Sequence, residues 1–173
     1  MNFAKIYECD IANGPGCRTS LFVSGCTRHC KGCHNPEAWD FDYGEPYTKK
    51  THDYILFSLS DPHIEGLSIL GGEPFEDENL DAVYVLVHNA KEMDKNVWVY
   101  TGFTWEQLMA QEDPRQRFYV MGIMAWIDVL VDGPFIEEEK DISLRFRGSR
   151  NQRIINAPES LKTGDVIMME EYM

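Results

Sequence analysis

The stretch Gly25-Cys-Thr-Arg-His-Cys-Lys-Gly-Cys-His-Asn35 decides how this chain is interpreted. It follows the apolar run Leu21-Phe22-Val23 and holds three of the chain's five cysteines in a C-x3-C-x2-C array. Three thiols this close together are typical of a metal or cluster site, because thiolates bind metals strongly. The sequence therefore predicts that Cys26, Cys30 and Cys33 share one inorganic centre.

The kind of centre follows from the number of cysteines. A structural zinc site normally needs four ligands, and His29 or His34 is available as the fourth. Such sites usually combine two C-x2-C knuckles separated by a spacer, and this sequence has no second knuckle. A [4Fe–4S] cube has four irons, each normally held by one thiolate. Three neighbouring cysteines therefore favour a cluster with one iron left open, over zinc.

Composition narrows the class of protein. The chain has 173 residues, of which 43% are hydrophobic and 26% charged, so we expect one domain over residues 1–173. A formal net charge of −13 argues against nucleic acid or an anionic membrane as a partner. With no apolar run near a membrane-spanning length and no signal peptide, a cytoplasmic location is expected. Thiols stay reduced there, so Cys9 and Cys17 are expected to be unligated thiols.

Strand and helix patterns alternate along the chain. We expect strands at 4–12, 18–24, 64–70, 97–100 and 127–131, helices at 48–59, 79–93, 104–110 and 117–126, a helical turn at 36–39, and an edge strand at 166–169. Short apolar strands that alternate with helices indicate an α/β fold with a mainly parallel sheet. The strands that alternate with helices in this way are the four at 18–24, 64–70, 97–100 and 127–131. Four strands cannot close an eight-stranded barrel, so an open sheet or partial (βα) barrel is predicted.

Four loops follow these strands and should meet at one edge of the sheet, where ligands bind. They are the cysteine loop, Gly71-Gly72-Glu73-Pro74, Thr101-Gly102 and Asp132-Gly133. The two glycines let backbone approach a ligand, and the Glu73 carboxylate can accept from an ammonium group. A plain strand-to-helix turn is the alternative for this motif, and ordinary capping is expected for Thr101 and Asp132.

Several motifs resemble a known family. The C-x3-C-x2-C loop after the first buried strand is similar to that of the radical S-adenosylmethionine (SAM) superfamily. The stretches Asn13–Arg18, Cys33–Asn35 and Trp39-Asp40 resemble the glycyl-radical-enzyme activases. Ile127–Phe135 and Arg147–Arg153 resemble the anaerobic ribonucleoside-triphosphate reductase activating proteins in particular.

The resemblance implies a radical SAM fold and a mechanism. Cys26, Cys30 and Cys33 would bind three irons of a [4Fe–4S] cluster, and SAM would chelate the fourth. An electron, supplied by a flavodoxin or ferredoxin type donor, would cleave SAM to a 5′-deoxyadenosyl radical. This radical would generate a glycyl radical on the large subunit of anaerobic ribonucleotide reductase. The family pattern places SAM against Gly32, Cys33, His34, Gly71, Gly72 and Glu73, and no further catalytic residue is assigned.

Other interpretations remain open at this point. Radical SAM alternatives are a pyruvate formate-lyase type activase and a small-molecule deazaguanine synthase, and the third alternative is a zinc-binding adaptor. The Asn13–Gly16 turn is expected near the mouth that receives the partner's glycine. The basic run Arg145, Arg147, Arg150 and Arg153 fits a docking segment and a solvated face equally well.

Overall fold

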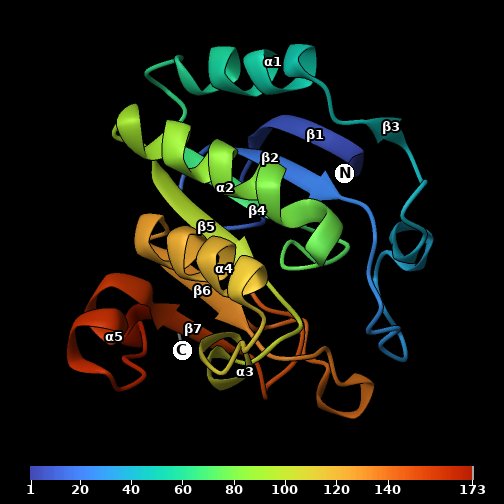
Figure 1. The fold of residues 1–173 in the computed structure, drawn as a ribbon. Coiled ribbons are helices and arrows are strands. Elements are labelled where there is room, and N and C mark those ends of the chain that lie inside the picture. The colour runs from blue at the N-terminus through green and yellow to red at the C-terminus, as the bar shows by residue number, and fades with distance from the viewer. Residues whose placement is uncertain (173) are drawn as a thin grey trace.

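A seven-stranded sheet forms the centre of the computed structural model, which describes residues 1–172 (Figure 1). Its spatial order is β3-β1-β2-β4-β5-β6-β7. The strands are β1 (Asn2–Asp10), β2 (Arg18–Val23), β3 (Glu45–Pro46), β4 (Gly66–Gly71), β5 (Asn96–Tyr100), β6 (Val129–Asp132) and β7 (Arg153–Asn156). β2, β4, β5 and β6 run parallel to one another, as the alternating pattern predicts.

The sheet is mixed, so the prediction of a mainly parallel sheet was wrong. β1 is antiparallel to both β2 and β3, and β7 is antiparallel to β6. The connection between β1 and β2 is a hairpin too short for a parallel crossover. After β6, residues 133–152 return to the same end of the sheet, and β7 runs back along β6. The sheet ends at β3 and β7 without closing on itself, which confirms the α/β class but not a barrel.

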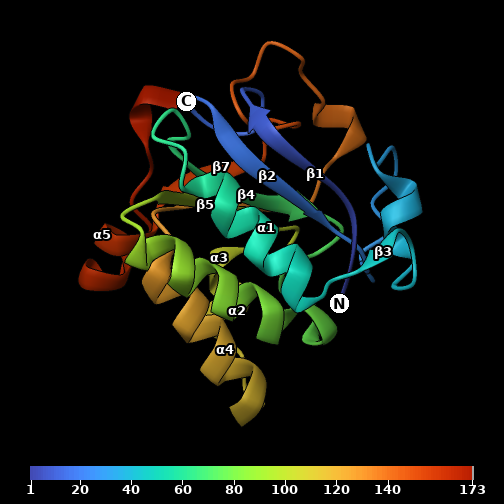
Figure 2. The ribbon, with the colours of Figure 1, turned by 90° about the horizontal axis from the view of Figure 1, so that it is seen from above.

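Three crossover helices cover one face of the sheet (Figure 2). They are α1 (Lys49–Leu59), α2 (Asp77–Glu92) and α4 (Pro114–Trp126), and the shorter α3 (Trp105–Met109) and α5 (Ala157–Thr163) complete the set. Thr48 and Thr104 cap α1 and α3 through their side chains. Single-turn 3₁₀ helices lie at Pro36–Trp39, Glu137–Glu139 and Glu170–Tyr172. No helix within residues 1–172 is long and apolar enough to cross a bilayer.

Alternation along the strands separates two layers. Leu21, Ile69 and Val99 face the helices and join the main core, whereas Trp98 and Val131 belong to a smaller apolar cluster on the other face. Residues 133–152, in orange, arch over that second face in Figure 2. One face is therefore sealed by helices, and the other is left to loops that can enclose a ligand.

Arg18 fixes the β1–β2 hairpin against the second face. Its guanidinium is buried and donates to Ser68 Oγ and to the carbonyl oxygens of Leu67 and Asn96, all at 2.8–2.9 Å. Burial lowers its pKa to about 10. Ser68 Oγ in turn donates to the carbonyl of Asn13 at 2.5 Å. The hairpin is thereby anchored to β4 and β5 rather than left mobile.

A disulfide joins Cys9 and Cys17, so the prediction of two unligated thiols was wrong. Antiparallel pairing of β1 with β2 brings their Cα atoms to 5.1 Å, within the range that a disulfide requires. The sequence reading assigned no partner to β1, and therefore missed this proximity.

Beyond β6 the sequence reading was least complete. It missed β7 and α5 there, and earlier in the chain it missed the two-residue β3. The predicted edge strand at 166–169 is one isolated bridge, between Met168 and Ile155 of β7, with backbone hydrogen bonds on either side. These elements are too short to show a clear periodicity, and tertiary contact decides their conformation.

Candidate functional site

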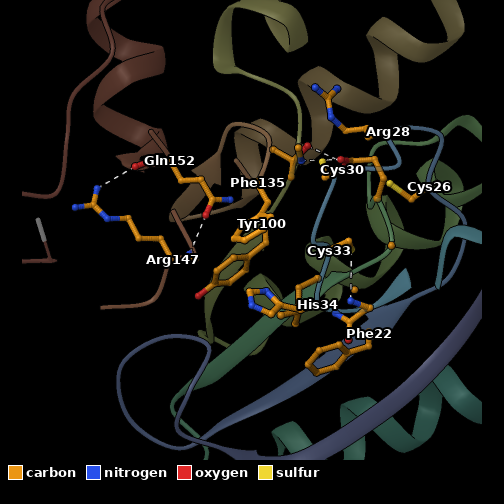
Figure 3. A pocket seen from close by; sticks show the side chains of 18 of the residues that line it. Phe22, Cys26, Arg28, Cys30, Cys33, His34, Tyr100, Phe135, Arg147 and Gln152 are labelled. Atoms are coloured by element: carbon orange, nitrogen blue, oxygen red, sulfur yellow. Dashed lines mark hydrogen bonds between the residues drawn. The ribbon is translucent and has the colours of Figure 1, made fainter. Parts of the chain in front are cut away.

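A pocket of about 510 Å³ opens at the carboxyl ends of the parallel strands (Figure 3). The strand-end loops predicted to share one edge do so here. The pocket is lined by residues of the cysteine loop (Cys26, Arg28, Cys30, Cys33, His34, Asn35), of strand ends (Phe22, Leu70–Glu73, Tyr100–Gly102, Gly133), of the β1–β2 hairpin (Ala12, Asn13) and of the later loops (Phe135, Leu144, Phe146–Gly148, Gln152), together with Trp39.

The cysteine loop is held at both its start and its end. Gly25 N donates to the carbonyl of Ala38 at 2.9 Å, and Cys26 N donates to that of Trp39 at 3.2 Å. Near the third cysteine, Asn35 N lies 3.4 Å from Cys33 Sγ. Figure 3 shows the three cysteine side chains on one side of the pocket. All three thiols are free and half-buried, so they are accessible to a metal centre.

The metal-binding side chains of the cysteine loop are not grouped around a single ion position. Within residues 1–172, no three His, Cys, Asp or Glu side chains are grouped so as to hold one metal ion. A cluster makes no such demand, since each thiolate binds its own iron. Burial raises the pKa of Cys26 to about 11. Its thiol must lose a proton on metal binding, so binding should strengthen as pH rises.

The Gly71-Gly72-Glu73 turn packs against the base of the cysteine loop. Gly72 N donates to Val23 O at 2.7 Å, and Glu73 N donates to Gly25 O at 2.8 Å. A Cβ on Gly72 would lie 2.6 Å from the carbonyl oxygen of Gly25, and Gly71 has a φ of +107°. Only glycine satisfies both requirements without moving backbone. The turn therefore positions the cysteine loop as well as lining the pocket.

Glu73 is fully buried, and its carboxylate is engaged by the protein's own groups. Its Oε1 accepts from Thr101 Oγ1 at 2.8 Å and from Phe75 N at 3.0 Å, while Oε2 accepts from Gly102 N at 2.8 Å. Burial raises the pKa of Glu73 from 4.5 to about 7, although these donors oppose the shift. Glu73 thus connects the β4 and β5 ends of the site.

This pKa shift predicts a pH-dependent stability. Between pH 4.5 and 7 the folded chain keeps the Glu73 proton that the unfolded chain releases, so the free energy of unfolding falls as pH rises. From pH 5 to pH 8, wild type should lose about 2 to 3 kcal/mol relative to Glu73→Gln, which cannot ionise. Denaturant unfolding of both proteins at the two pH values measures this. A difference that does not change with pH would show that the three donors keep Glu73 ionised.

His34 and Gly32, two other predicted SAM contacts, differ from each other in their position relative to the pocket. His34 lines the pocket, and its exposed ring packs on Phe135 with centroids 5.0 Å apart. Gly32 is exposed and does not line the pocket, and its Cα faces Glu137. Lys31 lies 2.9 Å from the same Glu137, so this part of the loop is turned toward the 3₁₀ helix at 137–139.

Arg28 and Tyr100 are pocket residues that sequence reasoning missed. The Arg28 guanidinium lies over the Phe103 ring at 4.7 Å. Among the described residues, neither Arg28 Nε nor the Tyr100 hydroxyl has a hydrogen-bond partner, although both atoms are buried. Such atoms are costly unless a ligand or water satisfies them. Their positions carried a signal, since Arg28 lies inside the cysteine motif and Tyr100 immediately precedes Thr101.

Most arginines of the basic run 145–153 are bound to groups of the same chain. Arg153 binds Asp132 and Glu106, and Arg150 binds Asp141. Arg147 donates to the carbonyl of Gln152 at 2.9 Å. Asp132 also accepts from Trp105 N at the start of α3, so its role is the capping that was expected. These contacts shape the loops around the pocket.

A second, shallower cleft of about 720 Å³ lies on the other side of the cysteine loop. Its aromatic part includes Trp39, which stacks on His29 with centroids 4.6 Å apart. Cys26 lines both this cleft and the main pocket. The cysteine loop therefore separates the two cavities and is accessible from both.

Comparisons with known proteins agree with the cysteine chemistry. A family model described as a 4Fe-4S single cluster domain matches residues 12–155. The anaerobic ribonucleoside-triphosphate reductase-activating protein of Vibrio cholerae is 44% identical over 158 residues, which are 89% of this chain and 97% of that protein. Its Escherichia coli K12 counterpart is 40% identical over 156 residues, 88% and 96% of the two chains. The protein of that name from Enterobacteria phage T4 is 35% identical over 158 residues, 89% and 93%.

Proposed function

The chain belongs to the family of anaerobic ribonucleoside-triphosphate reductase-activating proteins, and from this premise we propose that it activates such a reductase by reductive cleavage of SAM at a [4Fe–4S] cluster. In this role it is a radical SAM oxidoreductase that generates a glycyl radical on its partner. The observation that carries the proposal is one pocket in which three free thiols face a Gly-Gly-Glu turn and unpartnered polar groups.

The thiol count supports a cluster with one open iron. Cys26, Cys30 and Cys33 are free, whereas Cys9 and Cys17 are bonded to each other. Three thiolates are thus available to a cube that has four irons. A zinc adaptor would need a fourth ligand, and the two candidates, His29 and His34, pack on Trp39 and Phe135 instead.

The pocket also supplies groups suited to SAM. When bound together, the cluster and SAM supply the electron transfer and the organic radical that the reaction needs. Gly71 and Gly72 bring backbone to the ligand's amino group, with Glu73 fixing that turn from behind. Arg28 can bind a carboxylate, and Tyr100 can hydrogen-bond a ribose hydroxyl. The rings of His34 and Phe135 offer a stacking surface for adenine.

Replacing Tyr100 with phenylalanine should separate ligand binding from stability. The change removes a buried hydroxyl that has no hydrogen-bond partner among residues 1–172, so the SAM-free protein should gain about 1 kcal/mol in free energy of unfolding. SAM should bind about fivefold more weakly, because one hydrogen bond is lost. Calorimetric titration and denaturant unfolding measure the two effects. Tyr7→Phe, on exposed β1, is the matched control and should change neither quantity.

The electron donor must reach the cluster while SAM fills the main pocket. The second cleft gives that access, since it shares Cys26 with the pocket. A flavodoxin or ferredoxin type protein bound there would be separated from the cluster by little more than the cysteine loop. Such an electron donor is the second partner that the proposed reaction requires.

The decisive experiment combines reconstituted protein, SAM, reductant and the reductase subunit without oxygen. We expect a glycyl-radical signal in electron paramagnetic resonance and about one methionine for each radical formed. Cleavage of SAM without a glycyl radical would move the substrate to a small molecule. A protein that binds zinc, and shows no iron–sulfur absorption after anaerobic reconstitution, would overturn the radical mechanism.

A further inference from the structure

Two strongly exposed isoleucines stand on loops that line the main pocket. Ile11 is 76% exposed in the β1–β2 hairpin, directly before the lining residues Ala12 and Asn13. Ile142 is 94% exposed in the 140–148 loop, two residues before the lining residue Leu144. Both loops border the same pocket, the hairpin through Ala12 and Asn13 and the 140–148 loop through Leu144. Both isoleucines therefore stand at the rim of the same opening.

Each isoleucine is displayed by an ordered turn. Asp10 accepts from Ala12 N at 2.8 Å, so the turn closes around Ile11, and it also accepts from the side chain of Asn13 at 2.6 Å. In the second loop, Asp141 accepts from Ser143 N at 2.9 Å, so the turn closes directly around Ile142. These side chains extend into solvent from a fixed backbone, so little conformational entropy would be lost when a partner covers them.

The same rim carries a cation, Arg145, which packs on aromatic rings. Arg145 lies 5.5 Å from the ring centroids of both Phe146 and Tyr172. Within the described part of the chain it forms no ion pair. On a chain of net charge −13, an apolar rim that also carries an arginine fits a segment that combines apolar and acidic side chains.

We propose that Ile11 and Ile142 form an apolar rim that grips the polypeptide segment of the reductase entering this pocket. The inference rests on the proposed function, because a reaction at a backbone carbon requires the partner's chain to enter. A glycine inside a chain brings flanking residues with it, and these must cross the rim. Isoleucines exposed in the free protein would be buried there, where apolar contacts contribute most to affinity.

The test compares Ile11→Ser, Ile142→Ser and the double variant with wild type. Anaerobic biolayer interferometry measures the dissociation constant for the reductase subunit. Cleavage of SAM driven by a chemical reductant, without the reductase, measures the site itself. Each single change should weaken binding about fivefold to tenfold, and the double change about fiftyfold, with cleavage of SAM unchanged. Phe57→Ser is the matched control, because Phe57 is 77% exposed but lies on α1, over the helical face.

The outcomes separate this inference from the proposed function. If the double variant binds the reductase with the affinity of wild type and still forms the glycyl radical, the rim is overturned and the proposed function stands. A wild-type protein that cleaves SAM but binds no reductase would overturn the proposed function and the rim with it. Equal weakening by Phe57→Ser would show a general loss of surface hydrophobicity and would also overturn the rim.

Discussion

Replacing Cys30 with serine is expected to remove the iron–sulfur cluster and abolish cleavage of SAM while the chain still folds. A serine hydroxyl does not ionise in water near neutral pH, so it replaces a thiolate poorly as an iron ligand. Iron should fall well below the about four atoms per chain of wild type, and methionine production should fall at least about a hundredfold. Iron and sulfide analysis, visible absorption and product assay measure these losses.

The fold should survive because Cys30 contributes nothing to the core. It is half-buried on a loop, outside both apolar clusters. Circular dichroism and the unfolding midpoint of the cluster-free protein should match wild type. Cys17→Ser is the control, since it removes the disulfide and should leave the cluster intact. Full iron content with normal SAM cleavage in Cys30→Ser would refute the ligand assignment.

Gly72→Ala should damage both the site and the fold, although it adds one methyl group. The new Cβ would lie 2.6 Å from Gly25 O and 3.0 Å from Ala38 O, and neither backbone atom can move aside alone. The turn must separate from the base of the cysteine loop. We expect a loss of about 2 to 3 kcal/mol in free energy of unfolding. Cleavage of SAM should fall about a hundredfold, because a displacement near 1 Å is enough for that loss.

Gly164→Ala distinguishes this close contact from a general effect of losing glycine. Gly164 ends α5 with a φ of +83°, and a Cβ there meets no atom within 4 Å. Alanine should cost about 1 kcal/mol through backbone strain alone. Cleavage of SAM should be unchanged. If Gly72→Ala behaves in the same way, the contact with the cysteine loop is not what fixes the site.

Much of the site could be predicted because it lies where regular structure ends. The apolar runs that became β2, β4, β5 and β6 are buried and clearly bounded, and parallel strands bring their carboxyl ends to one edge. The sequence therefore predicts that the cysteine loop and Gly71-Gly72-Glu73 lie together. The number and spacing of the cysteines favoured a cluster over zinc, and the resemblance added SAM as the second cofactor.

What the sequence did not reveal depends on contacts between distant segments. Arg28 and Tyr100 line one pocket only after the cysteine loop folds toward the end of β5. The Cys9–Cys17 bond depends on a hairpin whose strand β1 is largely exposed and shows no clear alternation. The antiparallel return of β7 depends on residues 133–152, whose irregular backbone is held by side-chain hydrogen bonds. No local pattern encodes these arrangements.

The two ends of the sheet bear on how the protein behaves before its cluster is inserted. β3 is only two residues long and contains Pro46, which lacks an N–H group. At the other end, Met169 N donates to Ile154 O and Ile167 O accepts from Asn156 N, so the C-terminal segment occupies the outer side of β7. Long unpaired edges promote aggregation through strand pairing between molecules. β3 pairs only with Asn2 and Phe3 of β1, whereas the C-terminal segment runs along β7. Polypeptide alone therefore protects the β7 edge before the cluster is inserted, and strand pairing between cluster-free molecules is expected first along the outer side of β1.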